Sequence, residues 1–188
     1  NGAVSRYNSI RKQFPDPKSM QFIQANPSES FEKQKGLGSV ENQNLIKKFL
    51  LDDKIKYDTM CSFFSFHYNF ESQSTLNNAL KSLSKMIKKG GKVIIVTFDG
   101  ELVYNALKEN KGTLTLDYPE RNKTKVLFEI KQKYPDQTLS KITTGASIDL
   151  HNAIFMNEGE VQTEYLVPPK VLTASMKKHN FSLTETQL

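Results

Sequence analysis

Apolar residues recur along the chain with two different periods, and these periods predict its helices and strands. A spacing of three and four residues predicts helices over residues 3–14, 41–51, 71–90 and 100–110. Short apolar runs rich in β-branched and aromatic residues predict strands over residues 20–25, 56–66 and 92–98. Helices and strands therefore alternate up to about residue 110, which is typical of a doubly wound parallel sheet covered by helices.

The pattern changes in the second half of the chain. Residues 111–119 are expected to form an exposed loop, and Gly90-Gly91 are expected to end the helix before them. The segments 125–134, 140–156 and 160–167 predict an antiparallel extension, followed by a helix over 168–179 and a strand over 180–188. We interpret residues 1–188 as one α/β domain. Because it opens with a helix, we expect the first strands of the sheet to be missing.

Three clusters follow predicted strands, at the edge where parallel sheets bind ligands. They are Asn26-Pro27-Ser28, Phe63 to Phe70, and Thr97-Phe98-Asp99. Aromatic faces with one imidazole and few charges favour a flat heterocycle as the ligand. Each cluster also has a structural interpretation, namely a turn at Asn26-Pro27, a buried histidine at His67 and a helix cap at Asp99.

Composition narrows the classes of function only slightly. Lysine and arginine outnumber the acidic residues by 26 to 20, which favours polyanionic partners but serves solubility equally well. The single Cys61 excludes an internal disulfide, and three scattered histidines make a metal site an unfavoured interpretation. No apolar run approaches the roughly 20 residues that span a bilayer, so we expect no membrane partner.

Four segments carry a resemblance to a known family. They are SRYNSI (5–10), FHYNFES (66–72), KKGGKVIIVTFDGELV (88–103) and NEGEVQTEYLV (157–167). In this order they resemble the messenger-RNA cap (guanine-N7) methyltransferases, and most of all the methyltransferase domains of capping enzymes from large DNA viruses of the poxvirus and African swine fever virus kind. The resemblance implies a Rossmann-like class I fold, seen as an incomplete domain. It also implies transfer of a methyl group from S-adenosylmethionine to guanine N7, with S-adenosylhomocysteine as the product and no metal.

The resemblance also implies roles for individual residues. The cap guanine would contact His67, Tyr68, Phe70, Phe98, Phe155 and Glu164, and the methyl donor would contact Asn26, Pro27, Phe63 and Tyr68. A glutamate that accepts two N–H groups would select guanine over adenine. No catalytic acid or base is implied, because guanine N7 is itself nucleophilic. Phe64 and Phe66 are expected to be core residues.

The partners implied are the capped 5′ end of RNA (GpppN), and triphosphatase and guanylyltransferase domains on the same polypeptide. A viral enzyme of this kind would act in the host cytoplasm or the virion. The glycine-rich loop that holds the donor in this family would precede residue 1. Two alternatives stay open, namely a non-catalytic cap- or RNA-binding module of the same fold, and a class I methyltransferase that acts on another nucleobase.

Overall fold

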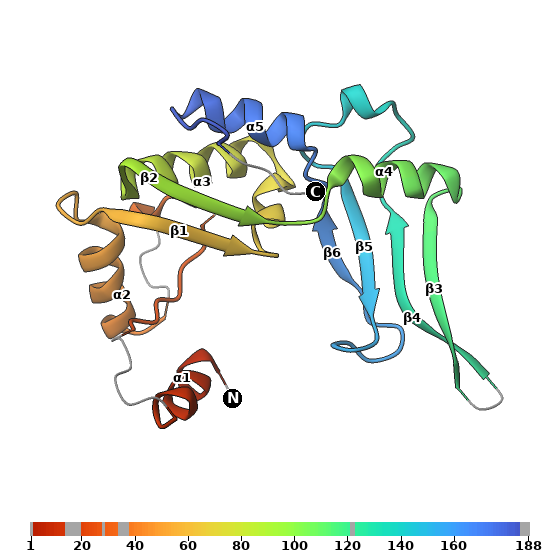
Figure 1. The fold of residues 1–188 in the computed structure, drawn as a ribbon, viewed down its shortest axis with the longest axis horizontal. Coiled ribbons are helices and arrows are strands. Elements are labelled where there is room, and N and C mark those ends of the chain that lie inside the picture. The colour runs from red at the N-terminus through yellow and green to blue at the C-terminus, as the bar shows by residue number, and fades with distance from the viewer. Residues whose placement is uncertain (1, 14–19, 28, 34–37, 121–122, 185–188) are drawn as a thin grey trace. The chain divides into compact units, whose positions relative to one another are not determined.

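The computed structural model describes residues 2–13, 20–27, 29–33, 38–120 and 123–184. The chain forms two compact units, both of which appear in the ribbon of Figure 1. We call them the helical unit (Asn1–Asn26 with Phe31–Ile55) and the sheet unit (Pro27–Ser30 with Lys56–Leu188). Among the described residues, no helix combines the length and the apolar character that a membrane crossing requires.

The helical unit contains helices α1 (Ala3–Arg11), η1 (Phe31–Lys33), α2 (Val40–Ile46) and the π-helical turn η2 (Lys47–Leu51). Ser39 begins α2 by accepting a hydrogen bond from the backbone N–H of Asn42 at 3.2 Å. The Asn42 side chain binds the backbone of Gln24 twice, at 2.7 and 2.8 Å. The prediction of a strand over 20–25 is wrong, because this segment is bound by the Asn42 side chain and by no strand in the described part of the chain.

The sheet unit begins with two parallel strands, β1 (Tyr57–Phe63) and β2 (Ile87–Val96). The 3₁₀ helix η3 (Phe66–Glu71) and helix α3 (Gln73–Met86) connect them. In the register of the pair, Phe63 lies opposite Val96, so both strands end at the same edge. This part of the chain confirms the alternation of strand and helix predicted from the sequence, and Figure 1 shows α3 lying along the strand pair.

The prediction that Gly90 and Gly91 end a helix is wrong, because both residues lie inside β2. Gly90 has a φ of +80°, and the strand register shifts between Tyr57 and Thr59, which indicates a bulge. A Cβ atom at Gly91 would lie 2.9 Å from the Asp58 carbonyl oxygen, so β1 approaches too closely for any side chain there. The glycine pair therefore serves strand pairing.

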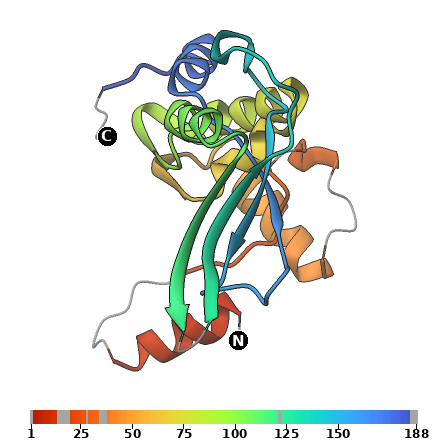
Figure 2. The ribbon, with the colours of Figure 1, turned by 90° about the vertical axis from the view of Figure 1, so that its right-hand side faces the viewer.

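The second half of the sheet unit is an antiparallel sheet in the order β3-β4-β5-β6. Its strands are β3 (Thr113–Glu120), β4 (Lys123–Gln132), β5 (Ser147–Asn152) and β6 (Gln162–Tyr165), with the 3₁₀ helix η4 (Leu139–Lys141) between β4 and β5. Helix α4 (Gly100–Glu109) precedes the sheet and α5 (Pro169–Lys178) follows it. Figure 2 shows β3 and β4 as a long hairpin.

Two predictions for this half of the chain need correction. Residues 111–119 are not a loop, because Leu114 and Leu116 alternate with polar residues and belong to β3, after a turn at Gly112 with a φ of +88°. The expected final strand is absent from residues 181–184, which have no regular structure, and its remaining part lies outside the described residues. The helix over 168–179 is confirmed as α5, with proline at its first position.

Two hydrophobic cores support the sheet unit. The first contains Tyr104, Leu107, Ile130, Ile148 and Leu166, and the second contains Phe66, Phe70, Leu76, Leu80 and Val167. Each fully buried Leu or Phe stabilises the fold by about 1.5–3 kcal/mol. The consecutive residues Leu166 and Val167 belong to different cores. The chain leaving β6 therefore joins the antiparallel sheet to the layer of α3 and α5.

Candidate functional site

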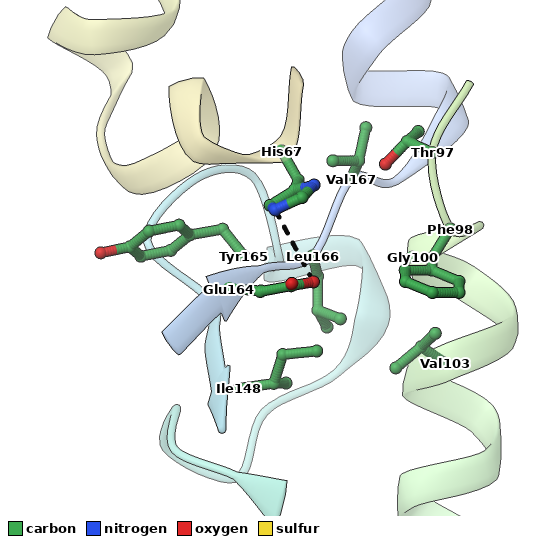
Figure 3. A pocket seen from close by; sticks show the side chains of 10 residues that line it. All are labelled: His67, Thr97, Phe98, Gly100, Val103, Ile148, Glu164, Tyr165, Leu166 and Val167. Atoms are coloured by element: carbon green, nitrogen blue, oxygen red, sulfur yellow. Dashed lines mark ion pairs between the residues drawn. The ribbon is translucent and has the colours of Figure 1, made fainter. Parts of the chain in front are cut away.

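A small pocket opens where the two cores of the sheet unit meet. Its walls come from η3, from the segment between β2 and α4, and from β5 and β6 (Figure 3). The lining residues are His67, Thr97, Phe98, Gly100, Val103, Ile148, Glu164, Tyr165, Leu166 and Val167. Its enclosed part has room for about one water molecule. The pocket can therefore admit the edge of a ligand, while the body of the ligand would rest on the rim.

Helix η3 places its aromatic residues in two different environments. The Asn69 amide donates to the Phe66 carbonyl at 3.1 Å, and the Thr75 hydroxyl donates to the Asn69 carbonyl at 2.9 Å. These bonds hold η3 against the start of α3, so that Phe66 and Phe70 enter the second core. Phe70, predicted to contact guanine, is fully buried and does not line the pocket. The structure places it behind the site as a core residue.

His67 and Glu164 meet inside the pocket, although 97 positions separate them in the sequence. The His67 Nε2 and Glu164 Oε2 atoms are 3.6 Å apart, and their side chains point towards one another in Figure 3. This distance exceeds that of a hydrogen bond. Burial lowers the pKa of the His67 imidazole and raises the pKa of the Glu164 carboxyl. Each group is therefore harder to charge than in water, and we interpret the contact at neutral pH as a carboxylate beside a neutral imidazole.

Three polar atoms of this pocket have unused hydrogen-bonding capacity. Neither ring nitrogen of His67, which is 3% exposed, has a hydrogen-bond partner among the described residues, and the same holds for the buried hydroxyl oxygen of Thr97. Buried polar groups without partners are uncommon in folded proteins and costly to stability. Their hydrogen-bonding capacity, beside the Glu164 carboxyl group, is chemically available to a ligand.

The start of α4 fixes the wall opposite η3. Asp99 caps the helix, as predicted, by accepting hydrogen bonds from the backbone N–H groups of Glu101 and Leu102 at 2.7 and 3.1 Å. The Gly100 N–H donates to the Val167 carbonyl at 3.1 Å. A Cβ atom at Gly100 would lie 2.6 Å from the Val167 carbonyl carbon, so only glycine permits this approach. The contact holds Thr97 and Phe98 beside the end of β6.

Exposed aromatic rings stand at the carboxyl ends of β1 and β2. Phe64 and Phe98 form a tilted pair with ring centroids 5.5 Å apart, and they are 56% and 43% exposed. The prediction that Phe64 belongs to the core is therefore wrong, whereas Phe66 is buried as predicted. Phe64 has a φ of +47°, which is uncommon for a bulky residue, and its N–H continues the strand ladder by donating to Val96 at 2.8 Å. The backbone thus turns this ring outwards.

Tyr68 completes the rim next to His67. The two rings are 4.1 Å apart between centroids, and the Tyr68 hydroxyl is bound by the side-chain amide of Gln162 on β6. Burial and the nearby Glu164 carboxylate raise the pKa of Tyr68, while the Gln162 hydrogen bond lowers it. Gln162 was not predicted from the sequence. Its position two residues before Glu164 was the available signal, because alternate residues of a strand share one face.

Four other predicted site residues do not line this pocket, namely Phe155, Phe63, Asn26 and Pro27. Phe155 is 83% exposed in the turn after β5 and does not line the pocket. Phe63 is 61% exposed at the end of β1. Asn26 belongs to the helical unit and Pro27 to the sheet unit, and both are exposed. Among the described ranges, no three His, Cys, Asp or Glu side chains gather as metal ligands would.

Comparison with known proteins identifies the family. A family model described as mRNA (guanine-N(7))-methyltransferase domain matches residues 19–187. A probable mRNA-capping enzyme of Acanthamoeba polyphaga mimivirus is 33% identical over 195 aligned positions, which cover 100% of this chain and 16% of that protein. The mRNA-capping enzyme of an African swine fever virus isolate (Pig/Kenya/KEN-50/1950) is 31% identical over 121 positions, covering 64% of this chain and 14% of that protein.

A solved S-adenosylmethionine-dependent methyltransferase from Clostridium acetobutylicum aligns with 94% of this chain and 58% of its own, at 14% identity and a TM-score of 0.46. The chain thus spans only a small part of the length of its curated viral relatives. The family model, in contrast, covers all but the first 18 residues and the last one. This α/β chain therefore belongs to the mRNA (guanine-N(7))-methyltransferase domain family.

Proposed function

We propose that the pocket binds the Watson–Crick edge of the cap guanine and presents its N7 atom for methylation. One observation carries this proposal, namely the partly buried Glu164 carboxylate beside the unpartnered polar atoms of His67 and Thr97. These atoms come from three separate elements, and the fold of the sheet unit brings them to one pocket. The family to which the chain belongs supports guanine as the ligand.

The hydrogen-bonding groups of the pocket complement guanine and not adenine. The N1–H and N2–H₂ groups of guanine are adjacent donors, which the two oxygens of Glu164 can accept together. The neighbouring O6 atom is an acceptor, which the Thr97 hydroxyl or an N–H of neutral His67 can satisfy. Adenine presents an acceptor at N1 and a donor at N6, so it would leave the Glu164 carboxylate poorly paired. Because the Glu164 side chain is only 13% exposed, the cost of leaving its charge unpaired favours guanine over adenine.

The aromatic rim would hold the flat faces of the base. Phe98 lines the pocket, and Phe64 and Tyr68 stand exposed beside it. Stacking of a base on an aromatic side chain contributes about 1–3 kcal/mol. Because methylation at N7 makes the ring cationic, the same aromatic faces also stabilise the charge that develops during transfer. We therefore assign the rim to Phe64, Tyr68 and Phe98, and we leave out the fully buried Phe70 and Phe155, which is exposed in the turn after β5 and does not line the pocket.

S-adenosylmethionine, when bound, supplies an electrophilic methyl group on a positively charged sulfur atom. The described residues that fit it are Phe63 and Tyr68, whose exposed rings stand at the carboxyl side of β1, where parallel sheets bind ligands. Asn26 and Pro27 remain proposals based on the family resemblance. The chain's own contribution to catalysis would be to orient guanine N7 towards the donor and to exclude water, without a general base.

The larger context of the reaction is also a proposal. The match of the family model extends through both compact units, which supports their belonging to one methyltransferase domain. The two viral relatives are named capping enzymes and are far longer than this chain. Their names support a capped 5′ end of RNA as the substrate. Other capping activities on the same polypeptide, and action in the host cytoplasm or virion, are proposals that rest on the family resemblance.

The test is methyl transfer from radiolabelled S-adenosylmethionine to GpppRNA, with the product identified after nuclease digestion. We expect the label in 7-methylguanosine, and none in RNA capped with 7-deazaguanosine, which lacks the acceptor nitrogen. Glu164→Ala or Tyr68→Ala should reduce turnover at least a hundredfold, whereas Glu158→Ala, which changes an exposed carboxylate of the same hairpin, should not. Label in another base would indicate a different methyltransferase, and cap binding without donor binding in calorimetry would indicate a non-catalytic module.

A further inference from the structure

We propose that Gln162 is a positioning residue, which holds the Tyr68 phenol in the orientation that the cap guanine requires. This inference rests on the proposed function of the pocket and extends it to a residue outside the predicted site. Gln162 lies on β6 and Tyr68 on η3, and the side-chain amide of Gln162 donates a hydrogen bond to the Tyr68 hydroxyl. The bond crosses 94 positions of the sequence and connects the two elements that carry Glu164 and His67.

Strand geometry places Gln162 beside Glu164. Residues 162 and 164 alternate with Thr163, so their side chains leave β6 on the same face. Gln162 is paired with Leu150 and Glu164 with Ile148 in the register with β5. Thr163 faces the other side of the sheet, where its hydroxyl donates to Asp149 at 3.2 Å. Gln162 therefore shares the sheet face of Glu164, which lines the pocket, whereas Thr163 does not.

Tyr68 needs such a partner because little else in the described structure restrains its hydroxyl. The ring is exposed at the rim and packs against His67 on one side. A tyrosine on the surface can rotate about two side-chain bonds, and each ordering of such a side chain costs entropy when a ligand binds. The Gln162 hydrogen bond supplies this ordering before the ligand arrives, so less of the binding free energy is lost.

The direction of the hydrogen bond gives Gln162 a second effect. Because the amide N–H donates to the Tyr68 oxygen, the phenolic proton is left free to donate to another acceptor. A phenol keeps this proton at neutral pH in any case, and burial and Glu164 raise the pKa of Tyr68 further. The arrangement thus presents Tyr68 as a donor at the rim of a pocket whose floor carries the Glu164 acceptor.

The experiment compares Gln162→Leu, which keeps the shape but loses the amide, with Thr163→Val, which loses a hydroxyl bond on the opposite face. Loss of one neutral hydrogen bond predicts about a three- to tenfold rise in KM for GpppRNA in Gln162→Leu, with kcat and KM for the donor changed less than twofold. In a Tyr68→Phe background, Gln162→Leu should cause no further rise. Thr163→Val should leave all of these constants within twofold of the parent.

A second measurement does not depend on activity. Ultraviolet titration of tyrosinate, with the curve of the matching Tyr68→Phe protein subtracted, isolates the titration of Tyr68. The pKa of Tyr68 should be higher in Gln162→Leu than in the parent protein, because the hydrogen bond that lowers this pKa is lost. An unchanged Tyr68 titration, or equal effects of Gln162→Leu with and without the Tyr68 hydroxyl, would overturn the inference. Full activity of Glu164→Ala would instead overturn the proposed guanine site, and the titration could still be read on its own.

Discussion

Replacing Glu164 by glutamine tests the proposed recognition of guanine with the smallest change of shape. The carboxylate can accept two N–H groups of the base, whereas the glutamine amide turns one acceptor into a donor that faces another donor. Hydrogen bonds to a charged group contribute about 1.5–3 kcal/mol each, so the loss should be about 2–4 kcal/mol. Since 1.4 kcal/mol corresponds to a factor of ten, kcat/KM for GpppRNA should fall by about 30- to 1,000-fold.

The stability of the protein should not follow its activity. Glu164 is a partly buried carboxyl whose pKa is raised by desolvation, so its ionised form costs free energy in the folded state at neutral pH. Glutamine removes this cost and keeps the volume, and the unfolding temperature of Glu164→Gln should be equal to or above that of the parent. Thermal unfolding followed by circular dichroism measures this, and it separates a lost ligand contact from a damaged fold.

An inosine cap makes the assay specific to the base edge. Inosine lacks the 2-amino group, so the parent enzyme should lose one of its two hydrogen bonds to Glu164 and prefer GpppRNA over IpppRNA by about tenfold or more. In Glu164→Gln this preference should shrink to less than about threefold. The assignment of Glu164 to the guanine edge would be refuted by a variant that keeps the parent's preference, whatever its absolute rate.

Further predictions address the surroundings of Glu164. Because burial raises the pKa of Glu164, KM for GpppRNA should rise as the pH falls towards that pKa, and the pH profile should be flatter in Glu164→Gln. Gly100→Ala should destabilise the protein by about 3 kcal/mol, because the new Cβ atom meets backbone atoms of Val167 that cannot rotate away. The unfolding temperature should fall by roughly 6–12 °C. An unchanged temperature would contradict the close approach. Phe64→Gly should weaken cap binding by about 1–3 kcal/mol, because a stacking ring is lost, and calorimetry with a cap analogue checks this. The protein should not lose stability, since a positive φ costs about 1–2 kcal/mol in a residue with a side chain and glycine avoids this cost. Phe155→Ser should leave kcat/KM within twofold, and a tenfold loss would return Phe155 to the site.

The sequence predicted the elements of the sheet unit better than their ends. Long periodic segments such as α3 and α4 were found because their apolar residues repeat over several turns. The errors fell where tertiary contacts decide the local structure. Gly90-Gly91 resemble a helix end in sequence, and only the neighbouring strand, which leaves no space for a Cβ atom at Gly91, reveals a strand position. The segment 20–25 has a strand-like composition but meets the Asn42 side chain.

The candidate site was predictable in its chemistry and less so in its geometry. His67 and Glu164 were expected from the resemblance, and the structure brings them within 3.6 Å of one another. Phe64 was assigned to the core within the predicted strand 56–66, and only its positive φ shows that the backbone turns it outwards. Phe70, three residues after His67, faces the core by the geometry of η3. Such reversals depend on backbone angles, which periodicity does not contain.

The location of the pocket explains why polar atoms without partners are tolerated there. Leu166 and Val167 enter different cores, and Gly100 fixes this segment by a backbone contact that leaves no space for a side chain. Packing on both sides thus determines where Glu164 and His67 lie, whether or not their own hydrogen bonds are made. Because the two hydrophobic cores fix the pocket, its shape does not depend on hydrogen bonds between its own polar groups. The unpartnered polar atoms therefore remain available to a ligand. If so, binding of a cap analogue should raise the unfolding temperature of the parent protein and have little effect on Glu164→Gln at the same concentration.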